Sequence, residues 1–568
     1  MNKVMLRSNL TFVCAVFTVL TWGASWQLLD NYYPWRTFYH DFVVFLGVFF
    51  LFGFMTVSQL FSTVVIPRLF LVLLAVSIIP WIQYGFGIIY FLGDAFISHL
   101  YLLGFAFAFL IGRNQGEYNL SPFCTVAAIV LLSSACVSVV LALLQFLQLE
   151  SGVFGVLALS DHSSRAYANL AQPNNLATLL LLGGACLCYL HETKRFGSIT
   201  FLSIWFFVCL GIAVTQSRTP LIGLVFLVAW WFLGRYKCQL QSLTIQKIIG
   251  MVAIFITAQY LAAAVAEGLL INNEVGSLRP SSARIYFWWQ MAHAILDFRW
   301  LGYGWNQVGM AQSEVVFQYA LPVPAYFEHS HNILLDILVW NGPFLGTVIV
   351  GVAAFYLFSL YTTCTTKEGW VALLAIGFLL IHGMLELPLE YAYFLLPLGI
   401  FLGIAFSQSS VLSESRRLVI PWYVHSSLLV LFAAGLVFVW GEYRYVEARS
   451  THVRMVAKQI YIPPSEVVHP RYSVFTQLTG FLSFMQQRAQ EGMSIQAIDE
   501  MKKVARRFPT PPVLFRYGLA LGLNDKILES KKELERLKLL HGQEMYDEAL
   551  NNMAILSKKY PQLTALLN

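Results

Sequence analysis

The chain contains a succession of long apolar segments, and several of them reach or exceed the ~20 residues that an α-helix needs to cross a bilayer. Only 12% of its 568 residues are charged, whereas a soluble chain carries roughly 25%. This combination excludes a soluble enzyme, a disordered tail protein and a nucleic-acid binder. We therefore expect an all-α polytopic membrane protein. The segments predict about 13 transmembrane helices (12–14), at 9–29, 41–60, 69–90, 95–112, 121–148, 173–190, 199–215, 219–234, 248–267, 333–361, 369–388, 391–407 and 420–440.

The charged residues divide the chain at about residue 440. Residues 1–440 contain 18 Lys and Arg against 17 Asp and Glu, whereas residues 441–568 contain 18 against 13. We interpret 1–440 as a transmembrane domain with a long polar loop at 268–332, and 441–568 as a water-soluble α-helical domain. A proline-rich stretch at 509–512 separates helical pieces that resemble one to two tetratricopeptide hairpins. This domain is either a solvated helical cap or a docking surface, and its basic excess favours an acidic partner.

The basic residues of the membrane domain predict its orientation. If the N-terminus is cytoplasmic, all five lysines and seven of the thirteen arginines of 1–440 fall on the inner side. Such a bias is typical of cytoplasmic connections, and it places loop 268–332 and the C-terminal domain on the outer side. The first apolar segment follows Lys3 and Arg7 and so resembles a signal peptide. It lacks a convincing cleavage site, and we therefore expect a retained helix.

Six arginines lie on the outer side against this rule. They are Arg36, Arg165, Arg218, Arg279, Arg284 and Arg299. Arginine binds phosphate through a planar fork and keeps its charge, although each could instead pair with a headgroup or an acidic neighbour. The candidate neighbours are Asp161, Glu274, Asp297 and Glu328. For Arg218 we favour a functional interpretation, because a buried cation between two spans is costly and usually functional.

Two histidines, His329 and His331, lie in the segment FEHSHN of the outer loop. They could bind a metal, cap the next span or act as a general base near neutral pH. The wider set of residues lacks cysteines and a compact group of carboxylates, so we expect no metal and favour the base. His293 and His162 are interpreted as structural.

The same loop predicts an amphipathic helix at the membrane interface. Arg284, Trp288, Ala292 and Ile295 have helical spacing, and glycines 302 and 304 end the pattern. A plain interfacial anchor explains the aromatic residues but not the arginine at its start. Outward arginines, a base, amide side chains and interfacial aromatics together suit transfer from a lipid-linked phosphate donor.

These residues form an ordered pattern that resembles the O-antigen ligase (Wzy-like) superfamily, and within it the protein O-oligosaccharyltransferase branch of the PglL type. The pattern begins in the first half of the chain with Gln172-Pro173-Asn174 and Ser217-Arg218. It continues with Arg284-x3-Trp288, Gly302-x-Gly304, His329-x-His331-Asn332, Gly342 and Pro388-Leu389-Glu390-Tyr391. The likeness runs from about residue 165 to 400, and QPNN departs from the more usual continuation of the first motif.

The resemblance implies a multi-pass enzyme of the bacterial inner membrane that works on its periplasmic face, inverting and without metal or cofactor. It implies transfer of a preassembled glycan from undecaprenyl diphosphate to a Ser or Thr hydroxyl of an exported acceptor protein such as a pilin. The loop and the C-terminal domain would then be periplasmic, and membrane lipids would be further partners. The ligase branch transfers to lipid A-core instead.

The resemblance also assigns roles. His331 matches the essential histidine, with His329 as a fallback, and Arg218 and Arg284 match the arginines that hold the diphosphate. Four further residues are implied in positioning donor or acceptor, and they are Gln172, Asn174, Asn332 and Tyr391, with Tyr393 as an alternative to Tyr391.

Three other functions remain open from the sequence. An O-antigen ligase or polymerase is disfavoured by the soluble domain and by the QPN and PLEY segments. A polyprenol-glycan transporter would need ionisable residues at mid-membrane depth and often internal repeats, and few such residues and no repeat are visible. A membrane scaffold would leave Arg218 and His-x-His-Asn unexplained.

Overall fold

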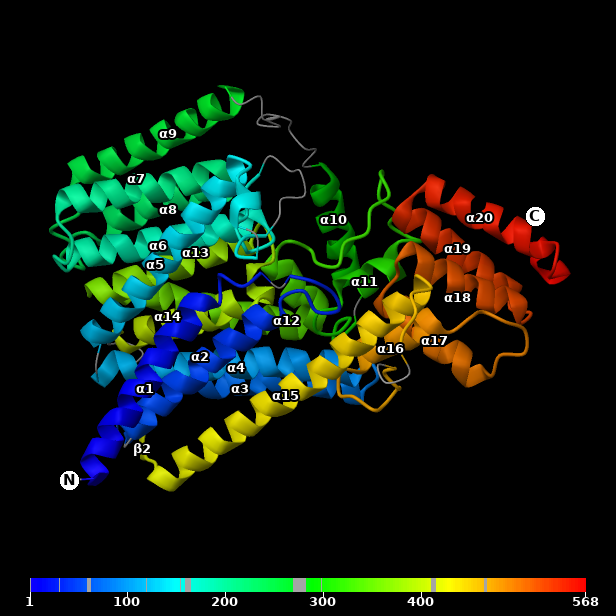
Figure 1. Cartoon of the computed structure of the whole chain (residues 1–568), viewed down its shortest axis with the longest axis horizontal. Coiled ribbons are helices and arrows are strands. Elements are labelled where there is room, and N and C mark those ends of the chain that lie inside the picture. Colours follow the sequence, from blue (N-terminus) through cyan, green and yellow to red (C-terminus); the bar gives the residue numbers. More distant parts are fainter. Residues whose placement is uncertain are drawn as a thin grey trace. The chain divides into compact units, whose positions relative to one another are not determined.

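The computed structural model describes residues 2–29, 31–58, 63–118, 120–153, 155–158, 165–268, 282–297, 299–409, 415–463 and 467–567. Helices and one short pair of strands, joined by turns and loops, make up this structure (Figure 1), which confirms the predicted all-α membrane fold. Every predicted span overlaps a helix. In the described part of the chain, eight helices are long and apolar enough to cross a membrane, and they are α2, α3, α4, α5, α6, α9, α12 and α15.

The elements have the following bounds. The first half of the chain forms α1 (Asn2–Ala24), α2 (Phe38–Val57), β1 (Thr63–Pro67), α3 (Arg68–Gly85), α4 (Leu92–Tyr118), α5 (Leu120–Phe146), α6 (Pro173–Glu192), α7 (Ser198–Val214), α8 (Thr219–Gly234), α9 (Ile245–Gly268) and α10 (Ser282–Leu296). The second half forms α11 (Val308–Val315), α12 (Ile333–Thr363), α13 (Lys367–Gly383), α14 (Ala392–Ser407), β2 (Ser415–Val419), α15 (Trp422–Ala457), α16 (Thr476–Gln486), α17 (Ile495–Arg507), α18 (Pro511–Leu523), α19 (Ile527–His541) and α20 (Gln543–Ser557).

The chain divides into two compact units. The first unit comprises Met1–Val76, Tyr101–Ser277 and Ala354–Phe438, and the second comprises Ser77–Leu100, Leu278–Ala353 and Val439–Asn568. The position predicted as a domain boundary, residue 440, lies inside α15, which runs on to Ala457 as one helix. No proline interrupts the helical segment.

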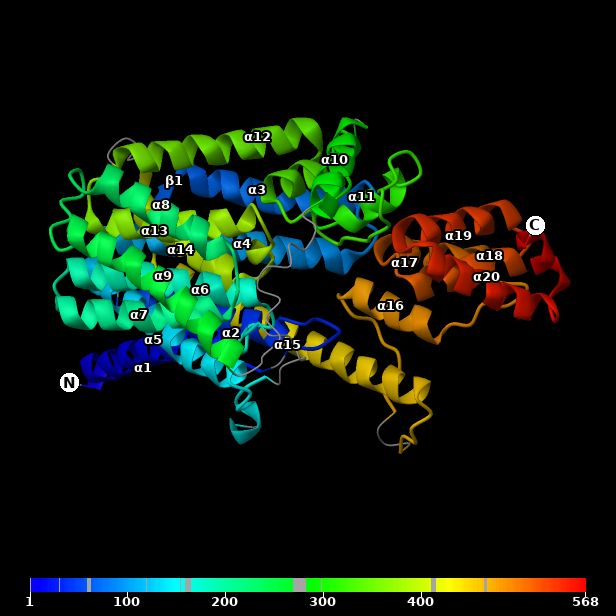
Figure 2. The ribbon, with the colours of Figure 1, turned by 90° about the horizontal axis from the view of Figure 1, so that it is seen from above.

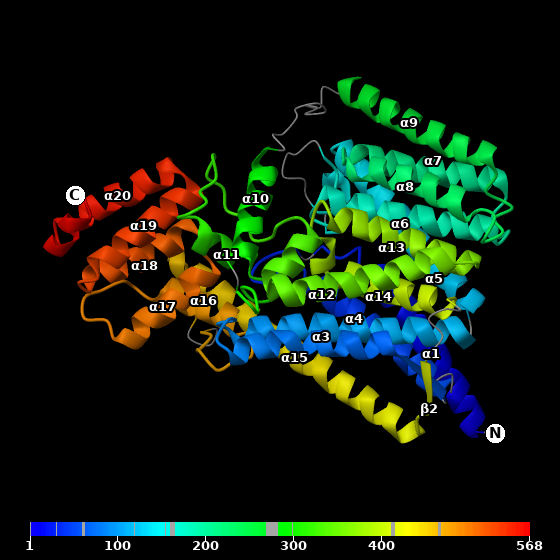
Figure 3. The same cartoon turned by 180° about the vertical axis from the view of Figure 1, so that it is seen from behind.

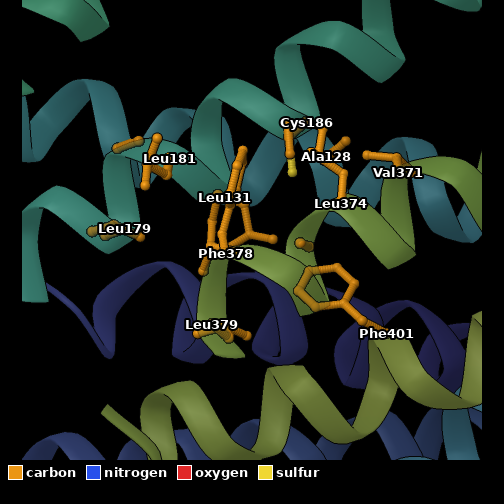
Figure 4. Packing of buried hydrophobic residues seen from close by; sticks show 14 of the residues in the cluster. Ala128, Leu131, Leu179, Leu181, Cys186, Val371, Leu374, Phe378, Leu379 and Phe401 are labelled. Carbon is orange, nitrogen blue, oxygen red and sulfur yellow. The ribbon is translucent and has the colours of Figure 1, made fainter. Parts of the chain in front are cut away.

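Helix α6 lies at the centre of the first unit. Nearly all of its side chains are buried, and it packs against α5, α7, α8 and α13 (Figure 3). Gly183 of α6 comes so close to Ala135 of α5 that a Cβ on the glycine would overlap the alanine methyl group. Small residues allow such close approach of membrane helices. Figure 4 shows the apolar core between these helices, including Leu131 of α5, Leu179 of α6 and Phe378 of α13.

Hydrogen bonds cap the start of α13 and join the two strands of the first unit. The side chain of Thr366 accepts a hydrogen bond from the backbone N–H of Gly369 (3.1 Å) and so caps the start of α13. Strands β1 and β2 form a two-stranded antiparallel pair, with Thr63 opposite Val419.

The second unit contains the helices of the C-terminal region. Helices α17, α18, α19 and α20 pack in sequence order as antiparallel neighbours (Figure 2). Their core includes Leu514, Tyr517 and Leu537, and it also contains Phe91 and Val316 from outside the C-terminal region.

Candidate active site

The predicted site residues fall in both units, and each group is described within its own unit. Gln172, Asn174, Arg218 and the two tyrosines belong to the first unit. Arg284, the two loop histidines and Asn332 belong to the second.

In the first unit, the side chain of Asn174 joins three segments. Its Oδ1 accepts hydrogen bonds from Ser217 Oγ (2.6 Å) and Arg165 Nη2 (3.3 Å). Its Nδ2 donates to Oε1 of the buried Glu386 (3.2 Å). Arg165 Nε also donates to the carbonyl of Thr215 (3.0 Å). Asn174 therefore links the start of α6 to the loop before α8 and to the segment after α13.

Gln172 directly precedes α6 in an extended conformation. Pro173 occupies the first turn of the helix, where a missing N–H costs nothing. Ala168 and Ala171 have positive φ angles of 50° and 56°, a conformation that non-glycine residues adopt only when the surrounding structure imposes it. Within the described residues, the side-chain amide of Gln172 makes no hydrogen bond.

Arg218 is the N-cap residue of α8, directly after the Asn174-bound Ser217. Its side chain is exposed on the surface of the first unit, at the end of a loop. Gln216 in this loop has a positive φ of 50°, and no acidic side chain among the described residues pairs with Arg218.

The two candidate tyrosines stack on each other, with ring centroids 5.2 Å apart and nearly parallel planes. Tyr393 is buried and accepts a hydrogen bond from Asn175 Nδ2 (3.4 Å), whereas Tyr391 is partly exposed. The carboxylate of Asp41 in α2 accepts the backbone N–H of Ala392 (2.7 Å) and fixes the start of α14 beside Tyr391.

In the second unit, the histidine loop (residues 327–332) is held by hydrogen bonds to Ser330. Trp288 Nε1 donates to the carbonyl of Ser330 (2.7 Å), and the Ser330 N–H donates to Asp336 Oδ1 (2.9 Å). His331 follows with a positive φ of 56°, and its ring meets that of Phe327 edge-on, with centroids 6.3 Å apart. The loop is thus anchored directly before a histidine with a strained backbone.

Asn332 acts as the N-cap of α12. Its Oδ1 accepts hydrogen bonds from the backbone N–H groups of Leu334 (3.1 Å) and Leu335 (3.3 Å). The side-chain oxygen therefore caps the helix and fixes its start directly after His331.

His329 is only weakly basic. Burial, followed by the neighbouring His331 and the positive charge of Arg507, lowers the pKa of His329 to about 3. A general base is most effective when its pKa lies near the working pH. His329 is therefore a poor proton acceptor.

Helix α10 packs against the histidine loop. The sequence predicted a helix at 284–295, and α10 (Ser282–Leu296) confirms it. Its buried side includes Phe287, which stacks on Phe327 (centroids 4.5 Å apart), and Met291. Arg284, one turn before Trp288, has an exposed side chain.

The backbone at Gly302 lies very close to the backbone of α12 at its kink, Gly342. Gly302 has a φ of 69° and Gly342 a φ of 77°, and a Cβ on either would overlap backbone atoms of the other's segment. The N–H groups of Tyr303 and Gly304 donate to the carbonyls of Val339 and Trp340. Only glycine fits both the left-handed conformation and the space.

The other outward arginines have structural partners. Arg299 forms an ion pair with Glu314, which was not among the candidate partners, and its guanidinium lies 4.4 Å from the ring centroid of Tyr303. The guanidinium of Arg36 lies 4.3 Å from the ring centroid of Tyr33. Four predicted residues lie outside the described residues, namely Asp161, His162, Glu274 and Arg279.

Comparison with known proteins identifies the family. Residues 201–351 match the family described as O-antigen ligase, and residues 370–552 match the family described as virulence factor membrane-bound polymerase, C-terminal. The chain is 30% identical over 545 residues to a general O-oligosaccharyltransferase of Acinetobacter baylyi, a match that covers 93% of both proteins. The chain belongs to the O-oligosaccharyltransferases. It is also 26% identical over 540 residues to a ComP-specific O-oligosaccharyltransferase of the same organism, covering 91% of this chain and 92% of that protein.

Membership confirms the resemblance inferred from the motifs, and it makes this O-oligosaccharyltransferase a glycosyltransferase. Within the ranges that the structure describes, no group of three or more His, Cys, Asp or Glu side chains is arranged to hold a metal ion. His293 stacks on Tyr319, with ring centroids 4.2 Å apart, in keeping with a structural role.

Sequence reasoning missed two acidic residues of the oligosaccharyltransferase that position candidate site residues. Glu386 holds Asn174, and Asp41 holds the start of α14. Glu386 lies in the polar segment 385–393, and Asp41 lies at the start of an apolar span. An isolated carboxylate in an apolar segment is a signal that could have identified Asp41, because such a group is costly unless it is bonded.

Proposed function

We propose that this enzyme transfers a preassembled glycan from undecaprenyl diphosphate to a Ser or Thr hydroxyl of an exported protein such as a pilin. The match to a general O-oligosaccharyltransferase over 93% of both chains carries the proposal. The reaction takes place on the periplasmic face of the bacterial inner membrane. The N-terminus is cytoplasmic, in line with the distribution of lysines, and the loop 268–332 and the C-terminal helices are periplasmic.

His331 is the general base of the proposed reaction. The acceptor oxygen attacks the anomeric carbon, the bond from that carbon to the phosphate oxygen breaks, and the proton of the hydroxyl passes to His331. The configuration at the anomeric carbon is inverted. The low pKa of His329 supports the choice of His331 over its neighbour.

Arg218 and Arg284 bind the diphosphate. Both side chains are exposed, and each lies at the first turn of a helix. Their charges would stabilise the negative charge that develops on the departing undecaprenyl diphosphate, a role that needs no metal. Gln172 and Tyr391 would orient the donor or acceptor through an amide and a neutral phenol. Asn174 and Asn332 would act indirectly, by holding the segments that carry the other residues.

Coexpression in a bacterium tests the proposal. The unmodified chain, a lipid-linked glycan and an exported Ser-bearing pilin are produced together, and glycan on the pilin is detected by a gel shift and by mass spectrometry. We expect glycosylated pilin with the unmodified chain and none with His331→Ala at equal membrane abundance. An unmodified pilin in both strains would contradict the proposal.

A second candidate function is that of an O-antigen ligase or polymerase, which the two family matches favour. In the same strain, glycan joined to lipid A-core would indicate the ligase, and lengthened lipid-linked glycan would indicate the polymerase.

A further inference from the structure

Ser330, the residue directly before His331, is hydrogen-bonded through its N–H, its carbonyl and its hydroxyl. The N–H donates to Asp336 Oδ1 (2.9 Å), and the carbonyl accepts from Trp288 Nε1 (2.7 Å). The hydroxyl donates to the carbonyl of Asn332 (2.8 Å). Ser330 has 0% of its surface exposed, and Asp336 is also buried. The backbone at Ser330 is therefore fixed by the protein itself, without a substrate.

The Ser330 hydroxyl bridges the backbone across His331. Besides donating to the carbonyl of Asn332, its Oγ accepts a hydrogen bond from the Asn332 N–H (3.2 Å). It thus bonds both backbone polar groups of the residue after the histidine. Serine hydroxyls that bond to the backbone two residues ahead stabilise turns. The bridge therefore closes the turn in which His331 lies.

The backbone conformation of His331 needs such a restraint. Its φ of 56° lies in the left-handed region, where the Cβ of an L-residue crowds the following carbonyl oxygen. A residue other than glycine keeps this conformation only when the surrounding structure imposes it. If the hydroxyl of Ser330 were absent, the histidine could relax toward an ordinary conformation, and its ring would then change direction.

The ring of His331 lies against an aromatic pair. It meets the ring of Phe327 edge-on, with centroids 6.3 Å apart, and Phe327 stacks on Phe287 of α10. His331 itself is partly exposed, whereas Ser330 is buried beneath it in the sequence of bonds described above. The two neighbouring residues therefore differ in kind: one carries a ring at the surface of the loop, and the other holds the backbone from inside.

We propose that Ser330 is a positioning residue for glycan transfer: its hydroxyl, by bridging the backbone groups of Asn332, holds His331 in the left-handed conformation from which its ring accepts the proton of the acceptor hydroxyl. Asp336 anchors Ser330 through the bond to its N–H. This inference rests on the proposed function, in which His331 is the general base. Because the serine hydroxyl is buried and bonded to backbone groups, it orients the histidine and does not attack the substrate.

Ser330→Ala tests the proposal, because it removes the bridging hydroxyl and changes no charge. The purified full-length variant is given a lipid-linked glycan and an acceptor protein. We expect kcat to fall by roughly 10- to 100-fold, the effect of misplacing a catalytic group. KM for the glycan donor and the amount of donor bound per chain should stay unchanged, because Ser330 touches no substrate. A merely structural role would lower kcat and the bound donor together, since fewer molecules would be folded.

Ser313→Ala is the matched control. Ser313 of α11 is also completely buried, but its hydroxyl has no hydrogen-bond partner among the described residues. Its removal should therefore leave kcat unchanged. The inference is overturned if Ser330→Ala keeps the unmodified kcat, if its bound donor falls in step with kcat, or if Ser313→Ala slows transfer equally.

Asp336 provides an independent second arm of the test. Asp336→Asn keeps an oxygen that can accept the Ser330 N–H, and we expect it to retain most of kcat. Asp336→Leu has a similar size but no acceptor, so its kcat should fall as in Ser330→Ala. Equal kcat values for the two Asp336 variants would overturn the anchoring role. Absence of transfer by the unmodified enzyme would instead overturn the proposed function, whereas undiminished transfer by Ser330→Ala would overturn this inference alone.

Discussion

Ser217 Oγ donates a hydrogen bond of 2.6 Å to Asn174 Oδ1, which ties the residue before Arg218 to the start of α6. Asn174 also bonds the buried carboxylate of Glu386 through its Nδ2. The two segments that supply Gln172 and Arg218 are thus held by one amide. Asn174 thus binds protein groups through both of its side-chain polar atoms.

Asn174→Asp should reduce glycan transfer strongly. The replacement keeps an acceptor for Ser217, but it removes the donor to Glu386 and places a second carboxylate beside it. Leaving a buried polar group without its hydrogen bond costs about 1–3 kcal/mol, and repulsion between like charges adds to this. We expect at least a tenfold loss of transfer and a lower melting temperature in detergent. Ser217→Ala, which removes one hydrogen bond and adds no charge, should be milder, and equal effects would count against this account.

Gly342→Ala should destabilise the protein. The residue has a φ of 77°, and an added Cβ would overlap the backbone carbonyl of Arg299. Gly351→Ala in the same helix is the control, since a Cβ there meets nothing within 4 Å and alanine favours a helix. Thermal unfolding in detergent should show a clear loss for the first variant and no loss for the second. A similar melting temperature for both would contradict the proposed glycine contact.

The membrane helices could be predicted from the sequence because the length and apolarity of a segment suffice to identify them. Helix α15 continues through residue 440, since a change from apolar to polar composition marks the end of a hydrophobic segment and not the end of a helix. Candidate site residues such as His331 and Arg284 could also be chosen from the sequence, because the motifs that contain them follow a recognisable order along the chain.

Contacts between distant segments could not be predicted. Nothing in the sequence near Asn174 indicates Glu386, which lies 212 residues away, and nothing near the histidines indicates Arg507. The hydrogen bond that ties the residue before Arg218 to Asn174 also joins segments that are distant in the sequence. The requirement for glycine at positions 302 and 342 follows from the close approach of their backbones, which only the structure shows.

Asn332→Ala should lower stability by about 1 kcal/mol, the usual effect of losing an N-cap side chain. The start of α12 would fray next to His331, so transfer should fall as well. Asn332→Asp and Asn332→Ser can each cap a helix and should retain most of both properties. Melting temperatures and transfer rates of the three variants check this, and full activity of Asn332→Ala would show that the cap does not position the histidine.

The low pKa of His329 predicts an acid-sensitive fold. In the unfolded chain this histidine takes up a proton near its usual pKa of 6.5, whereas in the folded protein it does so only at about 3. Its contribution to stability is therefore fully present above pH 6.5 and is lost as the pH falls toward 3. When the pH is lowered from 7.5 to 5, the melting temperature of His329→Gln should fall by less than that of the unmodified protein. Identical losses would show that His329 is not held neutral.

The most direct test of the central claim compares transfer by His331→Ala and His329→Ala. Both purified variants are given a lipid-linked glycan and an acceptor protein at pH 7.5, and the initial rate of glycosylated product is measured. Loss of a general base typically costs 10²–10⁴-fold in rate, so His331→Ala should be at least about 100-fold slower than the unmodified enzyme. His329→Ala should stay within about tenfold of the unmodified rate. Transfer by His331→Ala at the unmodified rate, or its abolition by His329→Ala alone, would contradict the assignment of His331 as the base.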